Sequence, residues 1–108
     1  MTTPVPDPSE IIHAGPLGAT LADAKTTALL RTPALTVIRL IVRAGQEIHS
    51  HTASGDATIH CLEGAIDFQV GDRRVRLSAG QLLYLAAGTL HAVHGVEDAS
   101  VLVTIVPH

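Results

Sequence analysis

The stretch AIDFQVGDRRVRL, residues 65–77, decides the class of fold, because its side chains alternate between apolar and polar. In an extended chain successive side chains point to opposite faces, so the apolar positions share one face and the polar positions share the other. The Gly71-Asp72 pair in the middle is typical of a tight turn. We therefore predict two antiparallel strands joined at this turn, with one face buried.

The same spacing extends along the rest of the chain. From position 45 onward glycines recur at positions 45, 55, 64, 71, 80, 88 and 95, which divides the sequence into segments of strand length. This spacing predicts an all-β sandwich or barrel. Segments 35–42, 81–85 and 101–106 are apolar on both faces, so each needs a cover on both sides, either a second sheet or the second subunit of a homodimer. Segment 21–30 has features of both a helix and a strand, and we favour a strand.

The composition is that of one folded domain. The chain has 108 residues, of which 46% are hydrophobic and 16% charged, which excludes a disordered segment. We expect residues 1–10, which hold three prolines, to form an extended N-terminal arm and residues 11–108 to form one domain. The net charge of −3 argues against a nucleic-acid partner. The sequence has no apolar run of membrane length and no signal-peptide pattern, so we expect no membrane partner and a cytoplasmic location.

Histidine supplies the main chemical clue. His49 and His51 are two residues apart, so on a regular strand both side chains point to the same face. His91 follows 40 residues after His51, and a distant strand can bring it opposite this pair. Three imidazoles suit a divalent transition metal such as Zn, Ni, Fe, Mn or Cu, whereas Ca and Mg require oxygen ligands. These three histidines are our candidate metal ligands.

The spacing of these residues resembles the two motifs of the cupin family. The first motif is matched by GQEIHSHTASGDATIHCLEG, residues 45–64, and the second by GQLLYLAAGTLH, residues 80–91. The resemblance covers about residues 35–106. It implies a double-stranded β-helix, which is a jelly-roll barrel, with a metal or ligand pocket in the barrel mouth. It also implies that a homodimer is a common assembly.

The chain departs from the cupin pattern at the acidic ligand. The metal-binding glutamate of the family falls at Ala57, which has no ligand atom, and the proline of the second motif is replaced by Ala86. A carboxylate would have to come from Glu47 or Asp56. On a regular strand Glu47 points to the same face as His49 and His51, and Asp56 is next to Ala57. Without a carboxylate, the set differs from the two-histidine, one-carboxylate arrangement of oxygen-activating iron enzymes.

Strand parity and the family topology also indicate which side chains line the pocket: Ala57, Ile59, Cys61, Phe68 and Val93. For Cys61 we prefer core packing to a nucleophilic role, because buried cysteines are usually small hydrophobic residues. His60 and His94 are expected outside the pocket, and Tyr84 is assigned a structural role within its apolar strand. The arginines could bind an anionic substrate. Arg73, Arg74 and Arg76 are interpreted as a solvated edge, whereas Arg39, on an otherwise apolar strand, is the stronger candidate for this role.

Two functions remain open from the sequence. The first is a metal-dependent cupin enzyme, such as an oxygenase or an isomerase, in which His49, His51 and His91 hold the ion. The second is a metal-free cupin that binds or senses a small molecule in an apolar pocket. No general acid or base is securely placed beside the histidines, so no catalytic residue is assigned.

Overall fold

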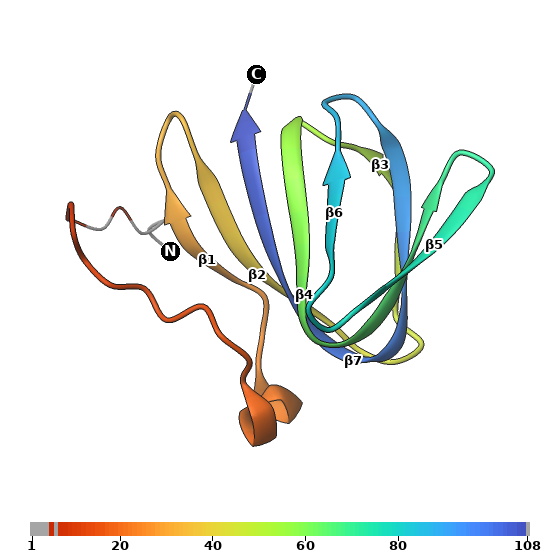
Figure 1. Cartoon of the computed structure of the whole chain (residues 1–108), viewed down its shortest axis with the longest axis horizontal. Coiled ribbons are helices and arrows are strands. Elements are labelled where there is room, and N and C mark those ends of the chain that lie inside the picture. The colour runs from red at the N-terminus through yellow and green to blue at the C-terminus, as the bar shows by residue number, and fades with distance from the viewer. Residues whose placement is uncertain (1–4, 6, 108) are drawn as a thin grey trace.

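The computed structural model describes residues 5 and 7–107, which fold mainly into antiparallel β-strands (Figure 1). The all-β prediction is therefore confirmed. The elements in chain order are a short 3-10 helix, η1 (Gly18–Asp23), and the strands β1 (Thr27–Arg31), β2 (Thr36–Val42), β3 (Glu47–Thr52), β4 (Gly55–Val70), β5 (Arg73–Ser78), β6 (Leu82–Leu85) and β7 (Leu90–Pro107). No helix in this described part of the chain is long and apolar enough to cross a membrane.

The long strands β4 and β7 form the centre of the structure. They pair antiparallel from Gly55 opposite Pro107 to Val70 opposite His91. One half of the pair is extended by β2 and β1 on one side and by β6 on the other, and the other half is flanked by β3 and β5. Figure 1 shows both strands bending at the bottom of the view, so that their two halves belong to different sheets. This arrangement is a double-stranded β-helix.

The bend depends on a close approach of the two backbones. The register between β4 and β7 shifts at several points between Cys61 and Ile66. At Gly64 the backbone has a φ of 78°, and a Cβ atom added there would lie 2.1 Å from the carbonyl oxygen of Asp98. Any side chain at this position would collide with backbone, so glycine is required for the bend.

The core lies between the two sheets. Its largest fully buried side chains include Phe68 and Ile66 of β4, Val42 of β2 and Val101 of β7. In the first half of β4 burial alternates from residue to residue, as period-two patterning requires when one face of a strand covers a core. Removal of this apolar surface from water is the main force that holds the sheets together.

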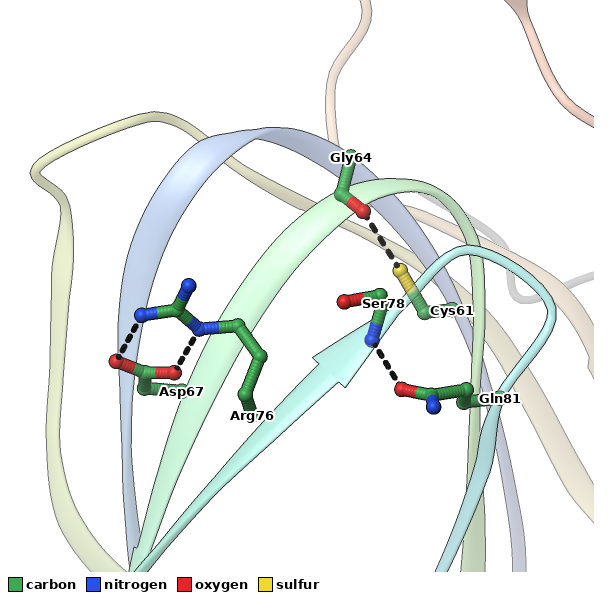
Figure 2. Close-up of polar contacts among 6 residues, drawn as sticks. All are labelled: Cys61, Gly64, Asp67, Arg76, Ser78 and Gln81. Carbon is green, nitrogen blue, oxygen red and sulfur yellow. Dashed lines mark hydrogen bonds and ion pairs between the residues drawn. The ribbon is translucent and has the colours of Figure 1, made fainter.

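The hairpin predicted from residues 65–77 is confirmed. β4 and β5 pair around the Gly71-Asp72 turn, and their inward positions carry the apolar side chains of the alternating stretch. Across the pair, the Arg76 guanidinium donates to both carboxylate oxygens of Asp67, at 2.6 and 3.3 Å (Figure 2). This hydrogen bonding holds the pKa of Asp67 below its usual value. In the turn that follows β5, the Ser78 amide donates to the side chain of Gln81 (Figure 2).

We predicted a single strand for segment 21–30, but the structure divides this segment between two elements. The 3-10 helix continues to Asp23, and β1 begins only at Thr27. The β-branched pair Thr26-Thr27 favours the extended chain, whereas the alanine-rich residues before it do not. Residues 1–4 and 6 of the predicted N-terminal arm lie outside the described residues, and residues 7–17 contain no helix or strand.

Arginines of β2 and its flanking turn hold the N-terminal segment against the sheet. Arg39 is buried and donates to the carbonyl oxygens of His13 and Gly15, at 3.1 and 2.7 Å. Arg43 donates in the same way to the carbonyl oxygens of Leu21 and Ala24, both at 2.7 Å. Arg39 thus satisfies backbone carbonyls at a place where no strand pairing is available.

Glu63 completes this attachment from β4. Its carboxylate accepts hydrogen bonds from the amides of Leu17 and Gly18, at 2.8 and 3.0 Å, and from the hydroxyl of Ser100. Burial acts to raise the pKa of Glu63, but these hydrogen bonds outweigh it and lower the pKa below 4.5. Because this pKa is lower in the folded than in the unfolded state, the ionised carboxylate stabilises the fold, and it does so fully at pH values above the unfolded-state pKa. The stabilisation is lost as the pH falls through the folded-state pKa.

We predict that Glu63→Gln lowers the free energy of unfolding by about 1–3 kcal/mol at neutral pH, because a charged acceptor of three hydrogen bonds is lost. The difference should shrink as the pH falls below 4.5 and Glu63 itself becomes protonated. Urea unfolding of both proteins across this pH range measures it. Glu97→Gln, an exposed carboxylate on β7, is the control. An equal loss in both variants, or a loss that persists in acid, would contradict this role of Glu63.

Candidate ligand pocket

Two of the three candidate histidines lie together in the barrel. His51 of β3 and His91 of β7 are direct partners in the antiparallel register. Their ring centroids are 4.2 Å apart, and the rings meet edge to face at 60°. His91 is buried, whereas His51 is exposed to solvent at the mouth. Neighbouring strands therefore hold the two imidazoles in contact.

Hydrogen bonds fix which nitrogen of each ring carries the proton. Nδ1 of His51 lies 3.0 Å from the carbonyl oxygen of His49, and Nδ1 of His91 lies 3.0 Å from the carbonyl oxygen of Thr89. A carbonyl oxygen only accepts, so both Nδ1 atoms donate, and in a neutral ring the lone pair is then on Nε2. Within residues 5 and 7–107 neither Nε2 atom forms a hydrogen bond.

The environment of His91 favours the neutral ring. Burial lowers its pKa below the usual range, and the nearby His51 adds to this effect. The hydrogen bond to the Thr89 carbonyl acts in the opposite direction but does not reverse it. At neutral pH His91 therefore offers an acceptor nitrogen rather than a positive charge.

The histidine pair lines two adjoining cavities, of about 130 and 160 Å³. The two cavities share His51, His91, Ile59 and Val103. The other lining residues are mostly apolar. Among the residues predicted to line the pocket, the first cavity contains Ala57 and Ile59, and the second contains Ile59, Phe68 and Val93.

His49 lies outside both cavities because β3 contains a bulge. From Ile48 to His51 β3 advances three residues, while β7 opposite advances two, from Val93 to His91. The extra residue changes the strand parity, so Ile48 and His51 both line the pocket although they are three residues apart. His49 is exposed, and its contribution is the carbonyl that orients His51. The prediction from sequence assumed an unbroken register.

The candidate carboxylates also lie elsewhere. Glu47 pairs with Nδ1 of His94 at 2.6 Å, beside Asp67 and Arg74, on a different surface. Asp56 accepts a hydrogen bond from the Ala87 amide, and it lines neither cavity. Among the described residues, no group of three or more His, Cys, Asp or Glu side chains is placed to hold a metal ion. The structure thus brings together two of the three predicted histidine ligands, His51 and His91.

The structure also bears on two further residues: it confirms the preferred core packing of Cys61, which does not line the pocket, and it leaves Tyr84 exposed. Cys61 lines neither cavity but packs in the core, where its thiol contacts the carbonyl oxygens of Glu63 and Gly64 (Figure 2 shows the latter). Burial raises the pKa of this thiol, which leaves it a poor nucleophile. Tyr84 does not pack into the core, since it is 62% exposed on the outer face of β6.

Comparisons with known proteins found one matching family and similar solved structures. Residues 37–107 match the family described as Cupin domain. A conserved protein of unknown function from Streptococcus pyogenes is 26% identical with a TM-score of 0.75, over 94% of this chain and 98% of that chain. A cupin superfamily protein from Desulfitobacterium hafniense is 15% identical with a TM-score of 0.75, over 92% of this chain and 100% of that chain. KdgF from Halomonas sp. is 21% identical with a TM-score of 0.69, over 77% and 79%. No curated protein matches the chain.

Replacing Ala57 with glutamate should create a metal site. Ala57 is buried and lines the same cavity as His51 and His91, so a carboxylate there joins two imidazoles. We expect Ala57→Glu to bind Ni²⁺ about tenfold more tightly than the parent, measured by calorimetry on chelator-treated protein. Thr58→Glu is the matched control, because the next side chain on β4 points to the opposite face. Equal affinities of the two variants would contradict this placement of Ala57.

Proposed function

The chain belongs to the cupin family, and from this premise we propose that it binds a small molecule in the barrel pocket without needing a metal. The observation that carries the proposal is the pair of Nδ1 hydrogen bonds to backbone carbonyls, which leaves both Nε2 atoms as acceptors beside an apolar cavity. A ligand with a hydroxyl or amide N–H donor complements these atoms. Apolar walls with a few fixed polar groups are the usual composition of a small-molecule site.

The three-histidine metal site, and with it a metal-dependent enzyme, stays a prediction. In its favour, metal-binding histidines commonly donate Nδ1–H to a carbonyl and ligate through Nε2, as the hydrogen bonds here permit. His51 and His91 would then hold the ion, which would supply a Lewis acid. His49 would have to leave its exposed position to join them. Measuring the metal bound by His49→Ala and by His51→Ala tests this site. An equal loss of bound metal in both variants supports three histidine ligands, whereas a loss in His51→Ala alone contradicts a ligand role for His49.

We predict that 1,6-hexanediol, a neutral donor probe, binds the pocket in the presence of a chelator. Amide shifts in a ¹H–¹⁵N spectrum should map to residues that line the cavities of the histidine pair. His51→Phe keeps a ring but removes the acceptor, and it should weaken binding by about fivefold, as expected for one hydrogen bond. His49→Phe is the control and should leave the affinity unchanged. Binding that requires added metal, or that falls equally in both variants, would contradict the proposal.

A homodimer is our proposal for the assembly. Apolar side chains remain exposed on β6 and at the end of β7, the two strands that pair with β4 on either side, where Leu82 is 64% and Val106 50% exposed. A second copy that covers these side chains would remove them from water.

Sedimentation should therefore give a dimer at micromolar concentration. Leu82→Glu should shift the protein towards monomer, because it places a charge in the apolar interface. Leu90→Glu, at an exposed leucine elsewhere on β7, should not. A monomeric parent protein would contradict the homodimer.

A further inference from the structure

The histidine pair is part of a longer row on the inner face of the barrel. In register, His51 of β3 lies opposite His91 of β7, His91 lies opposite Val70 of β4, and Val70 lies opposite Arg73 of β5. Residues that are paired across adjacent strands point to the same face of a sheet. Arg73 therefore shares the inner face with the histidines. Strands in a sheet are about 4.8 Å apart, which places its backbone roughly 10 Å from that of His91.

Arg73 stands at the edge of a third and larger cavity. This cavity, of about 310 Å³, is lined by Arg73 and by apolar residues that include Val70, Val75, Leu83 and Leu85. It lies between the edge strands β5 and β6, which both pair with β4 but not with each other. Leu85 also lines the mouth cavity that contains the histidine pair. Leu85 is thus a lining residue of both cavities, which lie on either side of its side chain or next to each other along it.

Arg73 is the one charged side chain among the described residues that line these three cavities. The residues that line the three cavities include Arg73 and the two histidines and include no aspartate or glutamate. Arg73 forms no ion pair within the described residues 5 and 7–107. Its neighbours on β5 differ: Arg76 pairs with Asp67, and Arg74 lies on the other face beside Glu47 and Asp67. An unpaired guanidinium at the edge of an apolar cavity complements a carboxylate.

We infer that the ligand of this pocket is a small organic acid, with its carboxylate on Arg73 and a hydroxyl or amide donor on the histidine pair. This inference rests on the proposed function. The apolar part of the ligand crosses Val70 and Leu85, and the distance of roughly 10 Å between the backbones at its two ends favours an elongated molecule. Arg73, which the sequence placed in a solvated edge, becomes the residue that selects anions.

The test compares 6-hydroxyhexanoate with 1,6-hexanediol, which has the same chain length and a terminal hydroxyl but no charge. Dissociation constants come from ¹H–¹⁵N titrations of the full chain with a chelator present. The acid should bind about tenfold more tightly than the diol, as a charge-assisted hydrogen bond predicts. Arg73→Gln should raise the dissociation constant of the acid to that of the diol and leave the diol unchanged. Arg74→Gln is the matched control, since it removes the same charge from the opposite face, and it should have no effect.

The outcomes separate the inference from the proposed function. If the diol binds but Arg73→Gln does not weaken binding of the acid, the inference is overturned and the histidine pocket stands. The same holds if Arg73→Gln and Arg74→Gln weaken binding of the acid equally. If the acid depends on Arg73 but His51→Phe changes neither probe, histidine recognition is overturned and the arginine site stands. If neither probe binds at millimolar concentration, both are overturned.

Discussion

The antiparallel pairing of β4 with β7 is the constraint on which the rest of the structure depends. These two strands are paired over nearly their whole length, and every other strand except β1 pairs directly with one of them. Because they bend together near Gly64, one continuous ladder supplies both sheets of the barrel. The buried side chains of the core come largely from these two strands. A residue larger than glycine at position 64 would disturb both sheets at once.

The pocket follows from the same pairing. His91 lies on β7, so the register with β3 and β4 determines which side chains stand beside it, His51 on one side and Val70 on the other. Backbone carbonyls then orient the two imidazoles, and this requires no further side chain. A fixed pair of acceptors in an apolar cavity loses little freedom when a ligand binds, which favours affinity for a molecule of complementary shape.

The sequence predicted what depends on local pattern. Alternation in residues 65–77 indicated the hairpin, glycine spacing indicated an all-β fold, and the two histidine motifs indicated the cupin family. It did not predict the bulge that moves His49 out of the pocket, because a one-residue shift in register depends on the partner strand. The exposure of Tyr84 was missed for a related reason, since β6 is an edge strand and its outer face is uncovered. The link from Arg73 to the histidines needs three cross-strand registers, of which the sequence indicated only the pairing of Val70 with Arg73 across the Gly71-Asp72 turn. The cytoplasmic location stays a prediction.

The central claim is that the His51 and His91 rings donate from Nδ1 to backbone carbonyls and present Nε2 to the pocket. A long-range ¹H–¹⁵N correlation spectrum of the imidazole rings measures this directly, with His51→Phe and His91→Phe to assign the signals. At neutral pH and with a chelator present, the account predicts the Nδ1–H tautomer for both rings. Rings that are protonated on Nε2, or on both nitrogens, would contradict it, because the pocket would then offer donors where the account requires acceptors.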